Sequence, residues 1–157
     1  MNKYEIEKLK KIYIHLLRSI KRENTDIEGL IKYLLSSDFF VAPCSSAHHL
    51  ACDGGLLKHS LNVYTNLCIL NRIKGAEIPD DSIKIVALCH DFAKIRYYEP
   101  YMQNKKVYSD IGSNSDSLGR FDWVPTKSYK KSEDRLCIGS HGETSEYITR
   151  TFIPLTL

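Results

Sequence analysis

The sequence predicts a mostly α-helical single domain of about five helices, with a β-hairpin inserted before the last helix. Apolar residues recur at steps of three and four over several stretches, which is typical of amphipathic helices. Between residues 95 and 136 aromatic and β-branched residues alternate instead with turn formers. The chain has 157 residues, 43% hydrophobic and 26% charged, a composition typical of one globular domain.

The first two predicted helices are interpreted as packing elements within residues 1–36. The first is expected over residues 4–21, and the second begins near Thr25. The Thr25 hydroxyl can cap this helix, and Glu28 follows three residues later. The apolar positions that predict the pair are Ile6, Leu9, Tyr13, Leu16, Leu17, Ile20, Ile27, Leu30, Ile31, Leu34 and Leu35.

Two further helices carry the chemically informative residues. The third follows the turn at residues 53–55 and ends near Gly75. The fourth starts after Pro79, with residues 80–82 as capping candidates, and ends at about Lys94. A short connection would place the two side by side and antiparallel.

The C-terminal third of the chain is expected to contain the β insertion and one last helix. We interpret residues 95–136 as an irregular β insertion, with residues 111–119 as the tip of a long hairpin. The last helix is expected over residues 143–152, and Pro154 then breaks it.

Charge and hydropathy narrow the classes of partner. The net charge of +3 is too small to indicate an extended duplex nucleic acid or a membrane surface as partner. No apolar run reaches the ~20 residues of a membrane-spanning helix, and the N-terminus has no signal-peptide pattern. We therefore expect a cytoplasmic protein.

The cysteines are expected to be free and structural. Their number is odd and no C-x-x-C spacing occurs, which argues against a disulfide framework and a structural zinc site. Cysteines within helix-like apolar patterns usually behave as small core residues. The five are Cys44, Cys52, Cys68, Cys89 and Cys137.

Three residues on the third and fourth helices have the chemistry of a metal site. His90 and Asp91 are adjacent at the end of the fourth helix, and His59 lies on the third, one turn after the glycines. Divalent metals accept imidazole nitrogen and carboxylate oxygen, so these residues can fill three coordination positions. Spacing alone also allows histidines that are hydrogen-bonded in the core, with the acid as their partner.

The two stretches that contain these residues resemble the HD superfamily of metal-dependent phosphohydrolases. Residues 54–61 (GGLLKHSL) are followed about 30 residues later by residues 87–94 (ALCHDFAK). The chain is most similar to small HD-family hydrolases of bacteria and their phages, which are related to the HD domain of certain bacterial 3′-to-5′ exoribonucleases. Residues 49–56, the aromatic hairpin with Trp123 and residues 139–143 (GSHGE) extend the resemblance.

The resemblance implies an HD-type helical bundle with one metal centre. His59, His90 and Asp91 would bind a divalent ion, which could be Mn, Fe, Co, Ni, Zn or Mg. Asp91 would also be catalytic, as the carboxylate nearest the bound water, while His49 and His141 would line the pocket and contact the substrate. The implied activity is hydrolysis of a phosphoester in a nucleotide or oligonucleotide, so the expected partner is a small phosphorylated substrate.

Other residues near these motifs have two interpretations each. Lys94 can direct its ammonium at a substrate phosphate, as a catalytic and substrate-binding residue, or can simply favour the C-terminal end of a helix. His48 does not match the family pattern, so we interpret it as structural. Four aromatic residues can stack on a base or pack on helices, namely Tyr97, Tyr98, Tyr108 and Trp123.

The sequence departs from the family pattern at its C-terminal end. Family members continue past the segment that matches residues 152–157 into a further helix, which supplies another histidine and the last acidic ligand. This sequence stops at Leu157, so the resemblance implies a C-terminally truncated domain with a weaker metal site. The alternative function is therefore that of a degenerate HD domain, which binds a nucleotide or a protein without turnover.

Overall fold

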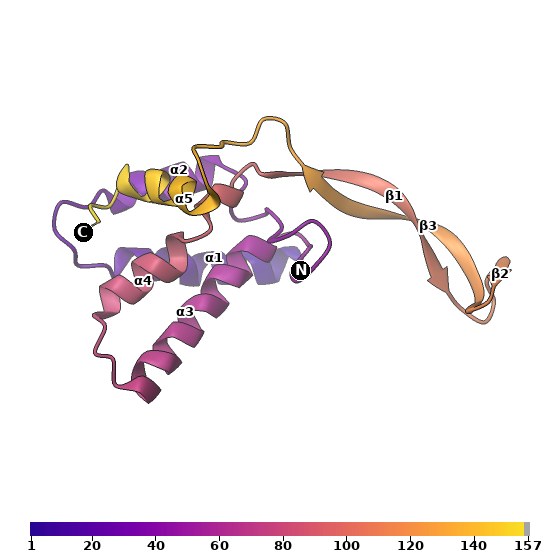
Figure 1. The fold of residues 1–157 in the computed structure, drawn as a ribbon, viewed down its shortest axis with the longest axis horizontal. Coiled ribbons are helices and arrows are strands. Elements are labelled where there is room, and N and C mark those ends of the chain that lie inside the picture. The colour runs from indigo at the N-terminus through magenta and orange to yellow at the C-terminus, as the bar shows by residue number, and fades with distance from the viewer. Residues whose placement is uncertain (156–157) are drawn as a thin grey trace.

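The structure, a computed structural model, describes residues 1–155, so the last two residues of the expected domain lie outside it. Helices form a body from which a long β-ribbon projects (Figure 1). The helices are α1 (Lys3–Arg18), α2 (Ile27–Ser36), α3 (Gly55–Lys74), α4 (Asp80–Cys89), the 3₁₀ turn η1 (Phe92–Lys94) and α5 (His141–Arg150). The strands are β1 (Tyr98–Tyr108), β2 (Asn114–Asp116) and β3 (Gly119–Lys131).

The expected mostly helical fold class is wrong, because the protein is a mixed α and β structure. β1 and β3 have 11 and 13 residues and pair antiparallel from Tyr98 and Lys131 to Tyr108 and Phe121. The short β2 pairs with the other edge of β3, which gives the strand order β1-β3-β2. The insertion is therefore a regular three-stranded sheet rather than an irregular hairpin. No residue of β1 is fully buried, so the sequence lacks the alternation of apolar and polar residues that a half-buried strand shows.

An aromatic cluster in the core connects the N-terminal helices to the segment after α4. Tyr13 and Phe39 are both fully buried, with ring centroids 5.0 Å apart, and Phe39 contacts Phe92 edge to face at 5.7 Å. The Tyr13 hydroxyl donates a hydrogen bond of 2.7 Å to the carbonyl of Leu88 in the last turn of α4. This bond satisfies a carbonyl that the helix end leaves without a partner, and it fixes the C-terminal end of α4.

The ends of the helices differ from the expected bounds for local reasons. Asp26, not Thr25, caps α2, because its carboxylate accepts a hydrogen bond from the backbone of Gly29. α4 ends at Cys89 rather than near Lys94, since Asp91 leaves the helical conformation with φ −110° and ψ 20°. None of residues 80–82 caps α4, whose N-cap is Pro79.

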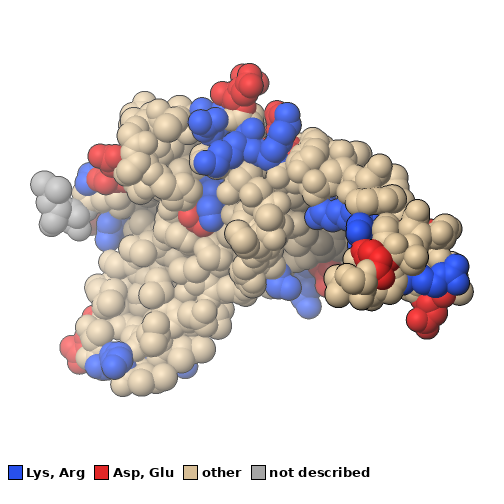
Figure 2. All heavy atoms as spheres, turned by 45° about the vertical axis from the view of Figure 1, so that its right-hand side comes forward, with Lys and Arg blue, Asp and Glu red and all other residues tan. Residues whose placement is uncertain are grey.

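The exterior combines charged areas with an apolar one. Figure 2 shows Lys, Arg, Asp and Glu side chains over the upper part of the helical body and over the β-ribbon, and a broad area without them over the lower part of the body. Several apolar side chains of α3 and α4 are exposed, among them Ile69, Leu70, Ile73 and Val86. Within residues 1–155 no helix combines the length and the hydropathy needed to cross a membrane.

Candidate metal centre

The turn after α4 places three polar groups on one side of the chain. His90 is the C-cap of α4, and its Nδ1 lies 2.9 Å from the carbonyl oxygen of Ala87. Because a carbonyl oxygen only accepts hydrogen bonds, Nδ1 carries the proton, and Nε2 faces the site. The amide of Lys94 bonds to the carbonyl of Asp91, so these two side chains share a face three residues apart.

His59 reaches the same point from the start of α3. Gly54 caps the helix in the left-handed conformation with φ +74°, which glycine adopts without strain. Gly55 lies so close to the carbonyl of Leu50 and the amide of Cys44 that a side chain would not fit. The segment before α3 therefore packs directly on the first turn of the helix, and His59 follows one turn later.

His141 comes from the first turn of α5, two residues before the expected start of that helix. Ser140 and Glu143 form a capping box that fixes this end of the helix. The hydroxyl of Ser145 accepts a hydrogen bond of 3.0 Å from the amide of Ala93, which joins α5 to η1. His141 is thereby held against the Asp91 carboxylate.

The donor atoms of His59, His90 and Asp91 form a close triangle. Nε2 of His59 and Nε2 of His90 are 3.2 Å apart, and each lies 3.3 Å from Oδ2 of Asp91. The ammonium of Lys94 lies 2.8 Å from the same oxygen, while Nε2 of His141 lies 2.7 Å from Oδ1. The Asp91 side chain is only 8% exposed, so several hydrogen-bonding groups converge on one buried carboxylate.

These contacts set the protonation states of the site. Burial raises the pKa of Asp91, but hydrogen bonds with His90, Lys94 and His141 outweigh burial and bring it well below its usual range. Burial lowers the pKa of His59, against the attraction of Asp91. The hydrogen bond with Asp91 raises the pKa of His90 despite burial. At neutral pH Asp91 is therefore ionised and His59 neutral, the forms in which these groups bind metals.

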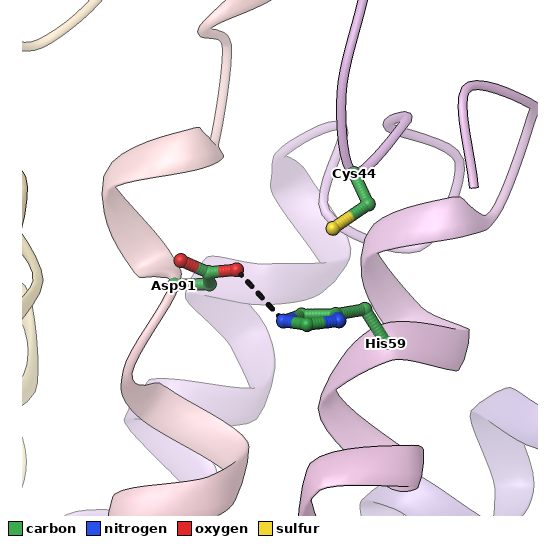
Figure 3. A group of neighbouring side chains, drawn as sticks. All are labelled: Cys44, His59 and Asp91. Atoms are coloured by element: carbon green, nitrogen blue, oxygen red, sulfur yellow. Dashed lines mark ion pairs between the residues drawn. The ribbon is translucent and has the colours of Figure 1, made fainter. Parts of the chain in front are cut away.

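The structure adds Cys44, which was expected to be a structural thiol. The donor atoms of Cys44, His59 and Asp91 all lie within 4.8 Å of one another, close enough to hold a metal ion. Figure 3 shows the three side chains directed toward one another from separate segments of the chain. No spacing rule could have identified Cys44, because it lies in a segment without periodicity and no motif joins it to His59.

The remaining predicted residues lie at different distances from this centre. The Lys94 ammonium is in it, 19% exposed and 3.4 Å from Sγ of Cys44. His49 is exposed and makes a minor contribution to the lowered pKa of His59. Tyr97 lies near the edge of the site, with its ring centroid 6.4 Å from that of His141.

Of the other predicted aromatic residues, one lies near the site and two lie on the β-ribbon. Tyr98 opens β1, and its ring packs edge to face on Tyr97. Tyr108 and Trp123 lie far along the ribbon, where both rings contact Phe121. His48 is exposed, and its backbone amide bonds to the hydroxyl of Ser45.

Comparisons with protein-family models, with curated proteins and with solved structures found no match to this chain.

Proposed function

We propose that the protein is a metal-dependent phosphohydrolase of the HD type, acting on a phosphoester of a nucleotide or oligonucleotide. The observation that supports this function is the close triangle formed by Nε2 of His59, Nε2 of His90 and Oδ2 of Asp91. Three nitrogen and oxygen donors at one point suit Mn, Fe, Co, Ni and Zn. The HD resemblance of residues 54–61 and 87–94 supports the same site.

The orientation of the His90 ring suits a metal ligand. The bond between His90 and the carbonyl of Ala87 leaves Nε2 as the ligand atom, which is the usual arrangement of metal-binding histidines. A divalent ion held by His59, His90 and Asp91 would lower the pKa of a bound water and offset charge on a phosphoryl oxygen.

Lys94 and His141 are suited to bind the substrate around this centre. The ammonium of Lys94 is held by Asp91 and partly exposed, so it can pair with a phosphate oxygen. His141 is 44% exposed, and its ring borders a cavity of about 190 Å³ also lined by Tyr97 and Arg135. A guanidinium and an aromatic ring in one cavity suit a phosphate and a base. His49, which is exposed, is also proposed to contact the substrate.

Metal analysis combined with a hydrolysis screen tests the proposal. The purified protein is analysed for bound metal and assayed on nucleotides, short oligonucleotides and a generic phosphodiester with Mn, Co, Zn and Mg. We expect a stoichiometric metal and hydrolysis that Asp91→Ala or His90→Ala lowers at least about 100-fold, at unchanged helical circular dichroism. His15→Ala, on the exposed side of α1, is the control and should leave activity unchanged.

Each other outcome has a defined meaning. No bound metal and no hydrolysis with any added metal would refute the enzyme. Binding of metal and nucleotide without turnover would instead support a non-catalytic binding module. Loss of the helical spectrum in both the Asp91 and His90 variants would favour a purely structural role for these residues.

A further inference from the structure

Cys44 differs from the other buried cysteine in its surroundings. Cys89 is 3% exposed and belongs to the hydrophobic core cluster, where a thiol behaves as a small apolar side chain. Cys44 is 5% exposed but lies outside that cluster. Its Sγ faces the imidazole of His59, the carboxylate of Asp91 and, at 3.4 Å, the ammonium of Lys94. A thiol among such polar groups is placed for chemistry rather than for packing.

The backbone holds this thiol in place before any ion binds. The amide of Cys44 donates a hydrogen bond of 3.1 Å to the carbonyl of Leu50, and the amide of Leu56 bonds to the carbonyl of Ala42 at 3.0 Å. Together with the close approach of Gly55, these bonds attach the segment to the first turn of α3. The position of Sγ relative to His59 is therefore set by the fold, as a pre-organised ligand requires.

We propose that Cys44 binds the metal of this centre as a thiolate, together with His59 and Asp91, and that the site therefore selects a thiophilic ion such as Zn, Co or Fe over Mg. The proposal rests on the proposed function, because it names a ligand of the same metal. On binding, the bond between Sγ and the ion forms while the S–H proton leaves to solvent. No electron is transferred, so no oxidant or reductant is needed.

The charges of the neighbouring residues favour this ligand set. Thiolate and carboxylate together neutralise a divalent ion, and His59 and His90 bind without charge. Lys94 lies within hydrogen-bonding distance of both anionic ligands, so its ammonium stabilises them when they are ionised. The ammonium then leaves one net positive charge at the centre for an anionic substrate. Soft thiolate ligands favour Zn over Mg, whose preferred ligands are oxygen atoms.

Cobalt substitution tests the ligand directly. Co(II) is titrated into the wild-type protein, Cys44→Ser, Cys44→Ala and the control Cys68→Ser, which lies on α3 away from the centre. We expect the wild type and the control to show the visible Co(II) bands together with a near-ultraviolet thiolate-to-cobalt band. Both Cys44 variants should lose the near-ultraviolet band and bind Co(II) and Zn(II) about 100-fold more weakly, with a smaller change for Mn(II).

A second measurement uses the unaltered chain and so does not depend on folding of the variants. X-ray absorption of the zinc-loaded protein should contain a sulfur ligand at about 2.3 Å as well as nitrogen and oxygen ligands. Zinc with nitrogen and oxygen ligands alone would overturn the proposal, as would a near-ultraviolet band that survives in Cys44→Ser. Either result leaves the proposed function intact, whereas failure of the wild type to bind any metal overturns both.

Discussion

Replacing Asp91 with Asn removes the carboxylate charge that binds Lys94 in the adjoining turn and His141 on α5. The structure gives this carboxylate two short bonds, from Lys94 at 2.8 Å and from His141 at 2.7 Å. A hydrogen bond to a charged group contributes at least about 1.5 kcal/mol to stability, and we assign this lower value to the bond from Lys94, which is largely buried. His141 is 44% exposed, so solvent screening reduces its share to about 0.5 kcal/mol. We therefore expect the metal-free variant to lose about 2 kcal/mol of unfolding free energy.

Thermal unfolding of the metal-free protein measures this loss. About 2 kcal/mol corresponds to a fall in Tm of about 4–8 °C for a chain of this size. Asp53→Asn is a matched control, because Asp53 also accepts bonds from a lysine and a tyrosine hydroxyl, Lys127 and Tyr129. Asp53 is 46% exposed, so its loss should lower the stability by less than about 1 kcal/mol and should not alter metal binding.

Two results would refute this reasoning about Asp91. An equal or smaller fall in Tm for Asp91→Asn than for Asp53→Asn would mean that the bonds with Lys94 and His141 do not stabilise the fold as calculated. Unchanged zinc affinity in Asp91→Asn, measured by competition with a chelating dye, would mean that the carboxylate is not a ligand. We expect that affinity to fall at least about 100-fold.

Three further predictions concern the centre and its supports. The hydrogen bond with Asp91 raises the pKa of His90 above 6.5, so a proton competes with the metal for this side chain near neutral pH. The zinc affinity measured by calorimetry should therefore rise with pH between about 6 and 8, and an affinity that does not change with pH contradicts this prediction. Tyr13→Phe leaves the carbonyl of Leu88 without its hydrogen-bond donor and should lower the unfolding free energy by about 1–2 kcal/mol. Urea unfolding measures this loss, and an unchanged urea midpoint would mean that the bond does not stabilise the fold. Gly55→Ala collides with backbone and should destabilise by at least about 2 kcal/mol and weaken metal binding, whereas Gly142→Ala, in open space, should do neither.

Local periodicity predicted the positions of the helices because each helix buries one face against a common core. The expected stretch at residues 4–21 corresponds to α1 (Lys3–Arg18), and Tyr13 and Leu17 of its apolar face are fully buried. Helix ends were predicted less well, since they depend on backbone conformations and single hydrogen bonds. The early end of α4 at Cys89 follows from the non-helical conformation of Asp91, which no propensity rule reveals.

The predicted fold class was wrong because the strands of the sheet, unlike the helices, do not bury one face against the core. Its strands project from the body, so neither face is buried continuously, and hydrophobic alternation is absent from β1. The register instead depends on eleven backbone pairings, from Tyr108 with Phe121 to Tyr98 with Lys131, between residues well separated along the chain. Charged pairs such as Lys130 with Glu99 and Lys106 with Asp116 lie on the exposed surface of this ribbon. Polar and charged residues of this kind are also typical of loops, so they do not identify a strand.

The candidate site divides in the same way between local and long-range information. His90, Asp91 and Lys94 lie within one turn, and the sequence indicated His90 and Asp91 as a pair while leaving two interpretations for Lys94. Cys44 enters through backbone contacts between the segment before α3 and the first turn of that helix. Because those contacts involve backbone amides and carbonyls, no pattern of side chains distinguished Cys44 from the other cysteines.

The arrangement of the two imidazoles argues against a purely structural role for them. Structural histidines usually have separate hydrogen-bond partners, whereas Nε2 of His59 and Nε2 of His90 face each other at 3.2 Å and share one oxygen of Asp91. Burial lowers the pKa of His59, whereas the hydrogen bond with Asp91 raises the pKa of His90. When both imidazoles are neutral, their two lone pairs repel each other unless a proton or a cation lies between them. A divalent ion accepts both lone pairs at once, and this geometry therefore supports a shared metal more strongly than a buried salt bridge.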